Sequence, residues 1–312
     1  MDACSETVVE KVKHQRTIIC EFDTPRDLNI EPFLQGSEQL HLAGVDAITM
    51  ADNSLASSRV SNLALGAILK MKFSIEPLVH ITCRDRNLLG QQSHLMGLHA
   101  LGIRQILIVS GDHPKLGDLP ESSPVFDVTS IELIRKVKEL NEGISFSGKP
   151  VRHRTSFIVG AAFNPHIRKI EHGIRRLEKK IEAGADFVMT QPIYDEQGIE
   201  LLYQATRDLP VPVFIGMMPI TSLKNAYFLN KMVPGMKIAK RIFERMSRGR
   251  DKEEEKKIGL QIAEELLDVA CEKFNGIYLI TPFDYWDLTY ALTQYIHQKN
   301  PYHHFSIRER MI

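Results

Sequence analysis

Short apolar runs recur along the chain, and helical or polar stretches separate them. Each run is rich in Ile, Val, Phe or Met, and the eight are TIICEF (17–22), AITMA (47–51), IEPLVHITC (75–83), QILIVSG (105–111), SFIVGAAF (156–163), FVMTQP (187–192), VFIGMMP (213–219) and GIYLITP (276–282). Several are continuous rather than alternating, which is typical of parallel strands covered on both faces. The pattern therefore predicts eight buried strands.

Helical patterns fill the gaps between these runs, for example at 30–44, 91–102 and 170–184. Three helix-to-strand joints, LAGVDAITM, ALGIRQILIV and EAGADFVMT, each carry a glycine suited to a left-handed helix cap. Five of the strand starts follow the previous one after roughly 26 to 31 residues, about the length of one strand–helix unit. Eight units in a row predict an α/β fold, a single (β/α)8 TIM barrel.

Two of the units are long. The segment 111–130, GDHPKLGDLPESSPVFDVTS, predicts a loop above the barrel. Between strands seven and eight the sequence predicts an extra helix at roughly 238–246 and a charged helix over 251–274. Because no linker rich in Ser, Gly or Pro interrupts the pattern, we expect one barrel over 15–298, an N-terminal extension (1–14) and a C-terminal tail (299–312).

The composition adds little to this picture. With 43% hydrophobic and 25% charged residues and a net charge of +0, the chain has no overall field that favours nucleic acid or a membrane as partner. The four cysteines show no CxxC pair, and Cys20 and Cys83 lie in strand-like runs where a buried free thiol is expected. Together with the absence of an apolar export signal, this predicts a cytoplasmic protein.

Polar residues stand where the predicted strands end, which is where barrel enzymes carry their catalytic groups. These residues are Glu21, Thr49, Asp52, His80, Thr82, Asp112, Asn164, Gln191 and Thr281. Alternatives remain open for several of them. His80 is also read as a hydrogen-bonded core histidine, Asp112 as part of an Asx-turn, and the basic helix 170–184 as a solvated face rather than a phosphate site.

The stretch TIICEFDTP (17–25) places Glu21 and Asp23 at the end of the first strand. A carboxyl group there either rests in solvent or acts as an acid. No GxGxxG, GxSxG or Walker-type loop is present, and we expect no metal site. From the residues alone, the chain is a barrel enzyme with a carboxylate pair, a rim amide at Gln191 and a candidate phosphate site.

Five motifs together resemble one family. CEFDTP, VHITC, SGDHP, EAGADFVMTQPIYD and GMMPITS match, in order and spacing from about residue 15 to residue 298, the flavin-dependent methylenetetrahydrofolate reductases. The chain looks most like the reductase half of bifunctional homocysteine methyltransferase–reductase proteins. The resemblance covers nearly the whole chain.

The resemblance implies roles for individual residues. Glu21 and Asp112 would be catalytic and would contact the substrate, together with Gln191 and Leu229. Flavin contacts would fall on Thr49, His80, Val109, Ser110, Gly111, Asp112, Asn164, Lys179 and Lys180. The chain departs from better-known members at Ser110, Asn164 and Leu229, where an arginine, a histidine and an aromatic residue are familiar.

The implied reaction is the reduction of 5,10-methylenetetrahydrofolate to 5-methyltetrahydrofolate in one-carbon metabolism and methionine biosynthesis. NADH or NADPH would reduce bound FAD and leave before the folate enters, a ping-pong scheme. Two alternatives are a flavin-free folate-binding barrel methyltransferase and a non-catalytic barrel subunit of a redox complex. Partners beyond the folate are not expected, and a homo-oligomer is compatible with the sequence.

Glu21 would protonate the departing nitrogen of the folate ring. We expect the apolar strand, Phe22 and the flavin to raise the pKa of its carboxyl group by desolvation. Asp23 is the weaker candidate, because it precedes Thr24–Pro25 and is expected to organise the turn.

Overall fold

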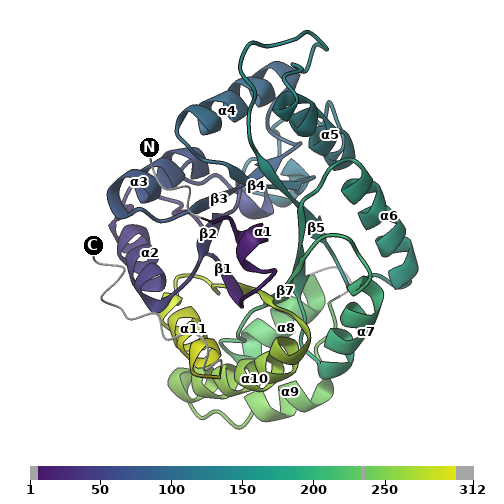
Figure 1. Cartoon of the computed structure of the whole chain (residues 1–312). Helices are drawn as coiled ribbons and strands as arrows, with labels where there is room; N and C mark the ends of the chain where they lie inside the picture. Colours follow the sequence, from purple (N-terminus) through teal and green to yellow (C-terminus); the bar gives the residue numbers. More distant parts are fainter. Residues whose placement is uncertain (1–5, 233–235, 300–312) are drawn as a thin grey trace.

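Eight parallel strands close into a barrel in the order in which they follow along the chain (Figure 1). The fold is seen in a computed structural model, which describes residues 6–232 and 236–299. The strands are β1 (Thr17–Glu21), β2 (Ala47–Met50), β3 (Pro77–Thr82), β4 (Gln105–Val109), β5 (Ile158–Phe163), β6 (Phe187–Pro192), β7 (Val213–Met217) and β8 (Gly276–Ile280). Each lies within one of the eight predicted runs, so the predicted (β/α)8 barrel is confirmed.

The strands are apolar on both faces because each face meets a different core. Ile19, Leu78, Phe187 and Phe214 belong to a core cluster inside the barrel. The alternate residues of the strands pack outward against the helices in a second, larger cluster. This double burial explains the continuous hydrophobic runs in the sequence.

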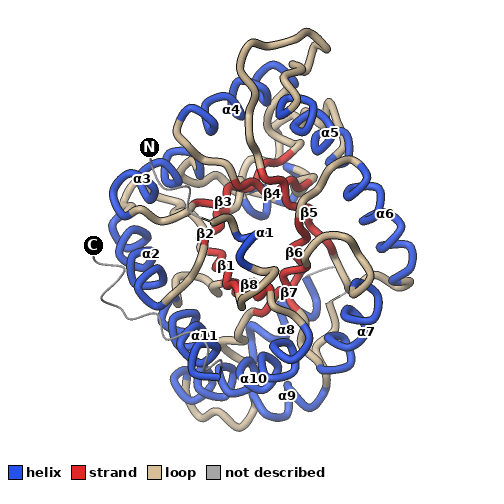
Figure 2. The backbone as a smooth tube through the Cα atoms, in the orientation of Figure 1, coloured by secondary structure: helices blue, strands red, loops and turns tan. Residues whose placement is uncertain are grey.

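Helices surround the barrel as a ring (Figure 2). Those that follow the first six strands are α2 (Glu31–Ala43), α3 (Asn62–Phe73), α4 (Leu88–Ala100), α5 (Ser130–Asn141), α6 (Ile170–Glu182) and α7 (Glu196–Thr206). The expected helices at 30–44, 91–102 and 170–184 correspond to α2, α4 and α6. Gly44, Gly102 and Gly184 all have positive φ angles, as predicted for the three glycine joints.

The two long units also contain what was predicted, with one addition. After β4, residues 111–129 of the predicted loop segment form a loop with a single short 3₁₀ turn, η2 (Pro114–Leu116), and residue 130 already begins α5. Between β7 and β8 lie α9 (Lys240–Met246), which is the predicted extra helix, and the charged α10 (Lys252–Lys273). A further helix there, α8 (Leu223–Met232), was not predicted, and α11 (Trp286–Lys299) follows β8.

A short helix, α1 (Val8–Lys11), lies across the end of the barrel where the strands begin (Figure 2). Thr7 and Glu10 form a capping box at its start. Val8 and Val12 are buried in the cluster inside the barrel, and Asn275 donates a hydrogen bond to the carbonyl of Val12. Residues 8–12 of the expected extension therefore close one end of the core, whereas nearly all of the expected tail (299–312) lies outside the described residues.

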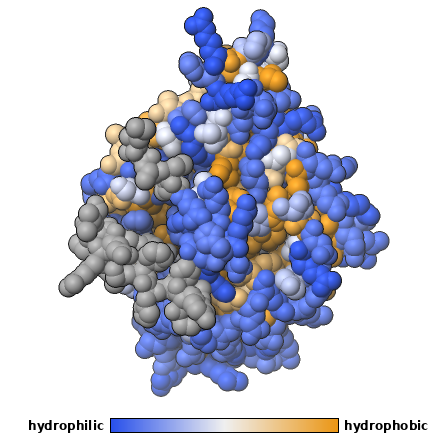
Figure 3. Space-filling model, in the orientation of Figure 1, coloured by the Kyte–Doolittle hydropathy of each residue, from blue (hydrophilic) through white to orange (hydrophobic). Residues whose placement is uncertain are grey.

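The molecular surface is mainly polar. Figure 3 shows hydrophilic side chains over most of one face, with hydrophobic ones between them near the centre. Among the described residues, no helix is both long and apolar enough to cross a membrane. Cys20 and Cys83 are buried free thiols, as predicted, and Cys4 lies outside the described part.

Candidate active site

A cavity of about 1220 Å³ lies at the ends of the strands opposite to α1. Its lining comes from strand ends, from loops after them, and from α6 and α8. Among the residues predicted from the sequence, it is lined by Glu21, His80, Val109, Ser110, Asp112, Asn164, Lys180, Gln191 and Leu229. The cavity therefore brings most of the predicted site together, at the end of the barrel where this fold carries its chemistry.

Glu21 stands at the end of β1, and its carboxyl group is held from within the barrel. The hydroxyl group of Tyr278 on β8 donates a hydrogen bond to Oε2 of Glu21. Nε2 of His80 lies 3.7 Å from the same oxygen. The side chain of Glu21 retains 20% exposure, so it is largely buried but still opens to the cavity.

The surroundings of Glu21 favour its protonated form. Burial, and then the negative charge of Asp23, raise the pKa of the Glu21 carboxyl to about 8, against the opposing effects of Tyr278 and Arg59. Burial likewise lowers the pKa of His80 to about 4, although Asp52 opposes the change. At neutral pH the two groups are therefore mostly uncharged, and Glu21 carries a proton that it can give away.

The raised pKa of Glu21 was predicted, but one expected cause was wrong. Phe22 points away from the cavity and stacks on Phe33 of α2, with ring centroids 5.1 Å apart. The desolvation therefore comes from inside the barrel and not from Phe22. Asp23 accepts a hydrogen bond from Ser54 and pairs with Arg59 at 2.9 Å, so it fixes the loop after β2, in line with the organising role expected for it.

Asp112 is exposed at the rim of the cavity, and its backbone is fixed from behind. It follows Gly111, whose φ of +85° is one that L side chains rarely adopt and where an added Cβ would lie 3.1 Å from side-chain atoms of Thr82 and Arg84. The guanidinium group of Arg84 donates a hydrogen bond of 3.2 Å to the carbonyl oxygen of Asp112. The side chain of Asp112 is thus left free to face a ligand.

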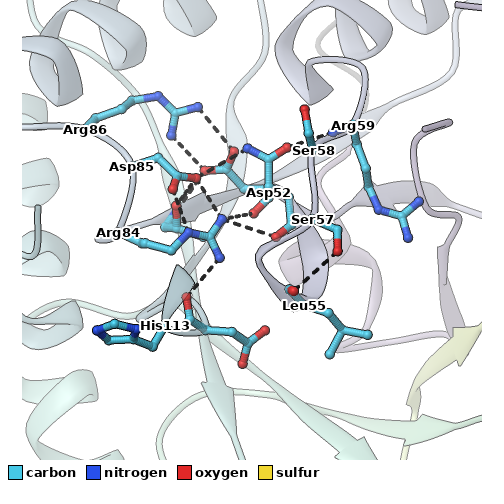
Figure 4. A network of polar contacts seen from close by, with 12 residues as sticks. Asp52, Leu55, Ser57, Ser58, Arg59, Arg84, Asp85, Arg86 and His113 are labelled. Atoms are coloured by element: carbon cyan, nitrogen blue, oxygen red, sulfur yellow. Dashed lines mark hydrogen bonds and ion pairs between the residues drawn. The ribbon is translucent and has the colours of Figure 1, made fainter. Parts of the chain in front are cut away.

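Arg84 joins this turn to the loop after β2 (Figure 4). Its buried guanidinium group also donates to the backbone carbonyls of Asp52 and Asn53, at 3.1 and 3.2 Å. Two further hydrogen bonds, of 2.6 and 2.7 Å, reach the carboxylate of Asp85. One buried arginine therefore holds two rim loops in register.

Asp52 is the second buried carboxylate at this rim (Figure 4). It accepts hydrogen bonds from both terminal nitrogens of Arg86, at 2.7 and 3.2 Å, and from the amide and hydroxyl groups of Thr82, both at 3.0 Å. Burial raises its pKa, but hydrogen bonding and charge from Arg86 outweigh burial and leave the pKa below its ordinary value. Asp52 is therefore a structural anion that ties β2 to β3.

The loop after β2 brings an apolar side chain to the cavity. Asn53, Leu55 and Ala56 all have positive φ angles, between 51° and 54°. Such backbone is uncommon for residues other than glycine and is kept only where the surroundings enforce it. The amide of Ser58 is held by the carboxylate of Asp118, and Leu55 lines the cavity while 59% exposed.

Gln191 reaches the cavity through an irregularity in β6. The pairing of β6 with β7 shifts register between Met189 and Pro192. There, the hydroxyl group of Thr190 accepts a hydrogen bond of 2.8 Å from the amide of Gly216. Irregularities of this kind re-aim side chains near active sites, and here Gln191 is exposed in an otherwise buried strand.

The wall of the cavity across the barrel from Glu21 is cationic. Lys180 of α6 is almost fully buried, and its ammonium group donates a hydrogen bond of 2.7 Å to the carbonyl of Ala162. Burial, and then the charge of Arg176, lower its pKa to about 8, so it is still mostly charged at neutral pH. Arg168, Lys169 and Arg176 line the same wall.

Three predicted contact residues lie outside this lining. Lys179 is exposed on α6 and does not line the cavity, although it adjoins Lys180 in sequence. Thr49 is fully buried beside Glu21 in the pairing of β1 with β2, and its hydroxyl oxygen has no partner among the described residues. Gly111 contributes the turn before Asp112. Their roles as flavin contacts remain predictions.

The sequence reasoning missed Tyr278 and Arg84, whereas Arg176 belongs to the basic helix 170–184 that it considered as a phosphate site. Tyr278 lies in the apolar run GIYLITP, and a continuous apolar run does not show which face of the strand a residue occupies. Arg84 lies two residues after the end of β3, and nothing in the sequence indicates its partners. Within the described residues, no group of three or more His, Cys, Asp or Glu side chains could hold a metal ion.

A closed (β/α)8 barrel with an acid and a cationic wall around one cavity defines the class: a TIM-barrel protein with an enzyme-like site at the carboxyl ends of its strands. The family model described as methylenetetrahydrofolate reductase matches residues 7–282. The chain therefore belongs to the methylenetetrahydrofolate reductase family.

Individual relatives are distant. The chain is 25% identical over 226 residues to "Probable methylenetetrahydrofolate reductase (NADPH)" of Caenorhabditis elegans. The matched segment covers 70% of this chain but only 32% of that protein. It is 22% identical to "5,10-methylenetetrahydrofolate reductase" of Pectobacterium carotovorum, with 87% of each protein covered. The chain thus spans about a third of the first relative and most of the second.

Solved structures agree with the barrel. A Clostridium thermocellum protein described as binding two copies of 5-methyl-5,6,7,8-tetrahydrofolic acid superposes with a TM-score of 0.62 at 14% identity. The match covers 94% of this chain and 100% of that one. At this identity the likeness supports the fold alone.

Proposed function

We propose that this chain reduces 5,10-methylenetetrahydrofolate to 5-methyltetrahydrofolate, with NADH or NADPH as electron donor and FAD as bound carrier. One observation carries the proposal. A carboxyl group that keeps its proton at neutral pH, that of Glu21, shares one cavity with a cationic wall, in a chain that matches the family over residues 7–282. The reaction needs both an acid and a site for a dinucleotide.

The residues present fit FAD. Lys180 and Arg176 would hold its diphosphate, because ammonium and guanidinium groups form charge-assisted hydrogen bonds with phosphate oxygens. The buried hydroxyl of Thr49 and Nε2 of His80 have no hydrogen-bond partner among the described residues, and such atoms normally find one. Bound there, FAD would supply the redox chemistry, which is the transfer of hydride from the nicotinamide to the folate.

Glu21 would act on the folate as a general acid. The substrate ring opens when its bond to N10 breaks, and N10 is a poor leaving group until it is protonated. The proton moves from the carboxyl group of Glu21 to N10, directly or through one water, and leaves a carboxylate. Opening leaves the methylene carbon bound to N5 as an iminium. The iminium carbon then accepts the hydride and becomes a methyl group.

Other residues would orient the substrate and hold its charge. The carboxylate of Asp112 would stabilise the cationic iminium, since its side chain is exposed at the rim while Arg84 fixes its backbone. Gln191 can donate and accept hydrogen bonds at the edge of the pterin. Leu107, Met189, Met218 and Leu229 line the cavity with apolar surface that limits water around the reacting atoms.

Half-reactions test this proposal. Protein reconstituted with FAD should show visible flavin absorption that bleaches with NADH or NADPH under anaerobic conditions. Addition of 5,10-methylenetetrahydrofolate should restore the absorption with the formation of 5-methyltetrahydrofolate. Failure to retain flavin would reject the proposal in favour of a flavin-free folate-binding barrel, and bleaching without reoxidation by the folate would reject the folate as acceptor.

A further inference from the structure

Tyr278 contacts Glu21 from the layer of side chains below it in the barrel. It lies on β8, is 6% exposed, and packs in the interior cluster with Ile19 and Phe214. Its hydroxyl group donates to Oε2 of Glu21 and has no other hydrogen-bond partner among the described residues. A buried tyrosine hydroxyl needs such a partner, so the geometry of the pair is specified from both sides.

Other groups near Glu21 do not hold it in this way. His80 is 3.7 Å from Oε2, beyond hydrogen-bond distance, and Arg59 is engaged by Asp23 and by the carbonyl of Thr24. The titratable or charged groups that face Glu21 or lie beside it are Tyr278 from β8, His80 from β3, Cys20 from β1, Asp23 from the loop after β1, Arg59 from the segment before α3, and Asp112 across the cavity. Within the described part of the chain, Tyr278 is the group that donates a hydrogen bond to the carboxyl group of Glu21.

We propose that Tyr278 is a positioning residue for Glu21, which fixes the orientation of the carboxyl group and stabilises the carboxylate that remains once the proton has left. This inference rests on the proposed function for the identity of the acceptor, N10 of the folate. The proton comes from Glu21, and Tyr278 keeps its own. Solvent returns a proton to Glu21 before the next turnover.

A positioning role predicts the sign of the change in the pKa of Glu21 when Tyr278 is altered, whereas a packing role predicts no change. A donor to a carboxylate stabilises the charged form, so the hydrogen bond makes Glu21 a stronger acid. Loss of the hydroxyl group in Tyr278→Phe should therefore raise the pKa of Glu21 by about one pH unit, the size expected of one hydrogen bond to a charged group. Proton transfer to the folate should slow by roughly three- to tenfold, because a weaker acid gives its proton less readily.

The pKa is measured in flavin-free protein, by the infrared carboxyl band that Glu21→Gln removes. Tyr278→Phe should shift its titration upward, whereas Tyr290→Phe, on α11 and away from the cavity, should leave it unchanged. Replacement of Tyr278 by 3-fluorotyrosine, a more acidic donor that keeps the fold, should shift it downward. An unchanged pKa in both Tyr278 variants overturns the inference.

The same variants separate this inference from the proposed function. If the wild-type protein, loaded with FAD, fails to reduce the folate, the proposed function is wrong whatever the titration shows. If the wild type is active and the two Tyr278 variants react with the folate at the wild-type rate, Tyr278 only packs. Opposite shifts in pKa, together with the slower folate step in Tyr278→Phe, support the positioning role.

Discussion

Two buried carboxyl groups at the same rim have opposite charge states. Asp52 is 4% exposed at its side chain and Glu21 is 20% exposed, yet the pKa of Asp52 is lowered and that of Glu21 is raised to about 8. Asp52 faces the guanidinium group of Arg86 and two donors from Thr82. Glu21 has one neutral donor and a negative neighbour. The partners, and not the depth of burial, decide which carboxyl group is a structural anion and which is an acid.

The largest effect is expected where the acid is lost. Glu21→Gln keeps the size of the side chain but cannot give a proton, so folate reduction should fall by at least roughly 10²-fold. FAD binding and reduction of the flavin by NAD(P)H should be nearly unchanged, because neither step needs this proton. Stopped-flow reoxidation of the reduced variant by 5,10-methylenetetrahydrofolate measures the effect. Reoxidation at the wild-type rate would make Glu21 a solvated carboxylate without a catalytic role.

The second prediction concerns the other carboxyl group of the comparison, Asp52, and removes its cationic partner Arg86. Arg86→Met should leave a buried carboxylate with the donors of Thr82 alone and lower the free energy of unfolding by about 2 kcal/mol, a value reduced for the 22% exposure of Arg86. Urea unfolding at neutral pH measures it. The loss should shrink near pH 4, where Asp52 can take up a proton. The double variant with Asp52→Asn is the control and should recover part of the loss.

Lys180 offers a third buried charge, whose ammonium group donates a hydrogen bond to the neutral carbonyl of Ala162. Lys180→Met keeps most of the apolar stem and should weaken FAD binding by about tenfold through the loss of one charge-assisted contact. Lys179→Met is the matched control, since Lys179 is the next residue of the same helix but lies outside the cavity. Fluorescence titration with FAD compares the two. An equal loss in both variants would assign the effect to the overall charge of α6.

The smallest effect concerns stability against pH. Because the pKa of Glu21 is raised on folding, the folded state binds the proton more tightly, and stability falls as pH rises from about 4.5 to 8. Glu21→Gln lacks this dependence, so its advantage over the wild type should grow across that range and level off above it. We expect the Tm of Glu21→Gln to gain a few degrees on that of the wild type between pH 5 and pH 8. A constant difference between the two Tm values from pH 5 to pH 8 would contradict the raised pKa.

The sequence predicted the barrel because its signals are local. Apolar runs, glycine caps and the spacing of units each depend on a few neighbouring residues. Glu21 and Gln191 were found for a related reason, since both stand at strand ends that a barrel brings to one rim. Contacts between distant residues carried no such signal: Tyr278 and Glu21 are separated by 257 positions, and the tyrosine stands in a run that reads as core.

The sequence also did not predict to which side a given side chain points. Phe22 adjoins Glu21 in sequence but lies on the opposite face of β1, among the outer helices. Lys179 and Lys180 are neighbours on α6, and one residue of a helix turns the side chain by about 100°. Which of the two lysines reaches the cavity depends on how α6 packs against the barrel. The basic residues repeated along the helix do not indicate this packing.

The helix α1 determines from which side of the barrel ligands can reach the cavity. Val8 and Val12 fill the barrel core at the end opposite to the cavity, so no molecule can pass through the barrel from one side to the other. Whatever binds beside Glu21 therefore enters and leaves on the side of the barrel where the strands end. Under the proposed function, a donor and an acceptor that both need the space beside Glu21 would have to occupy it one after the other.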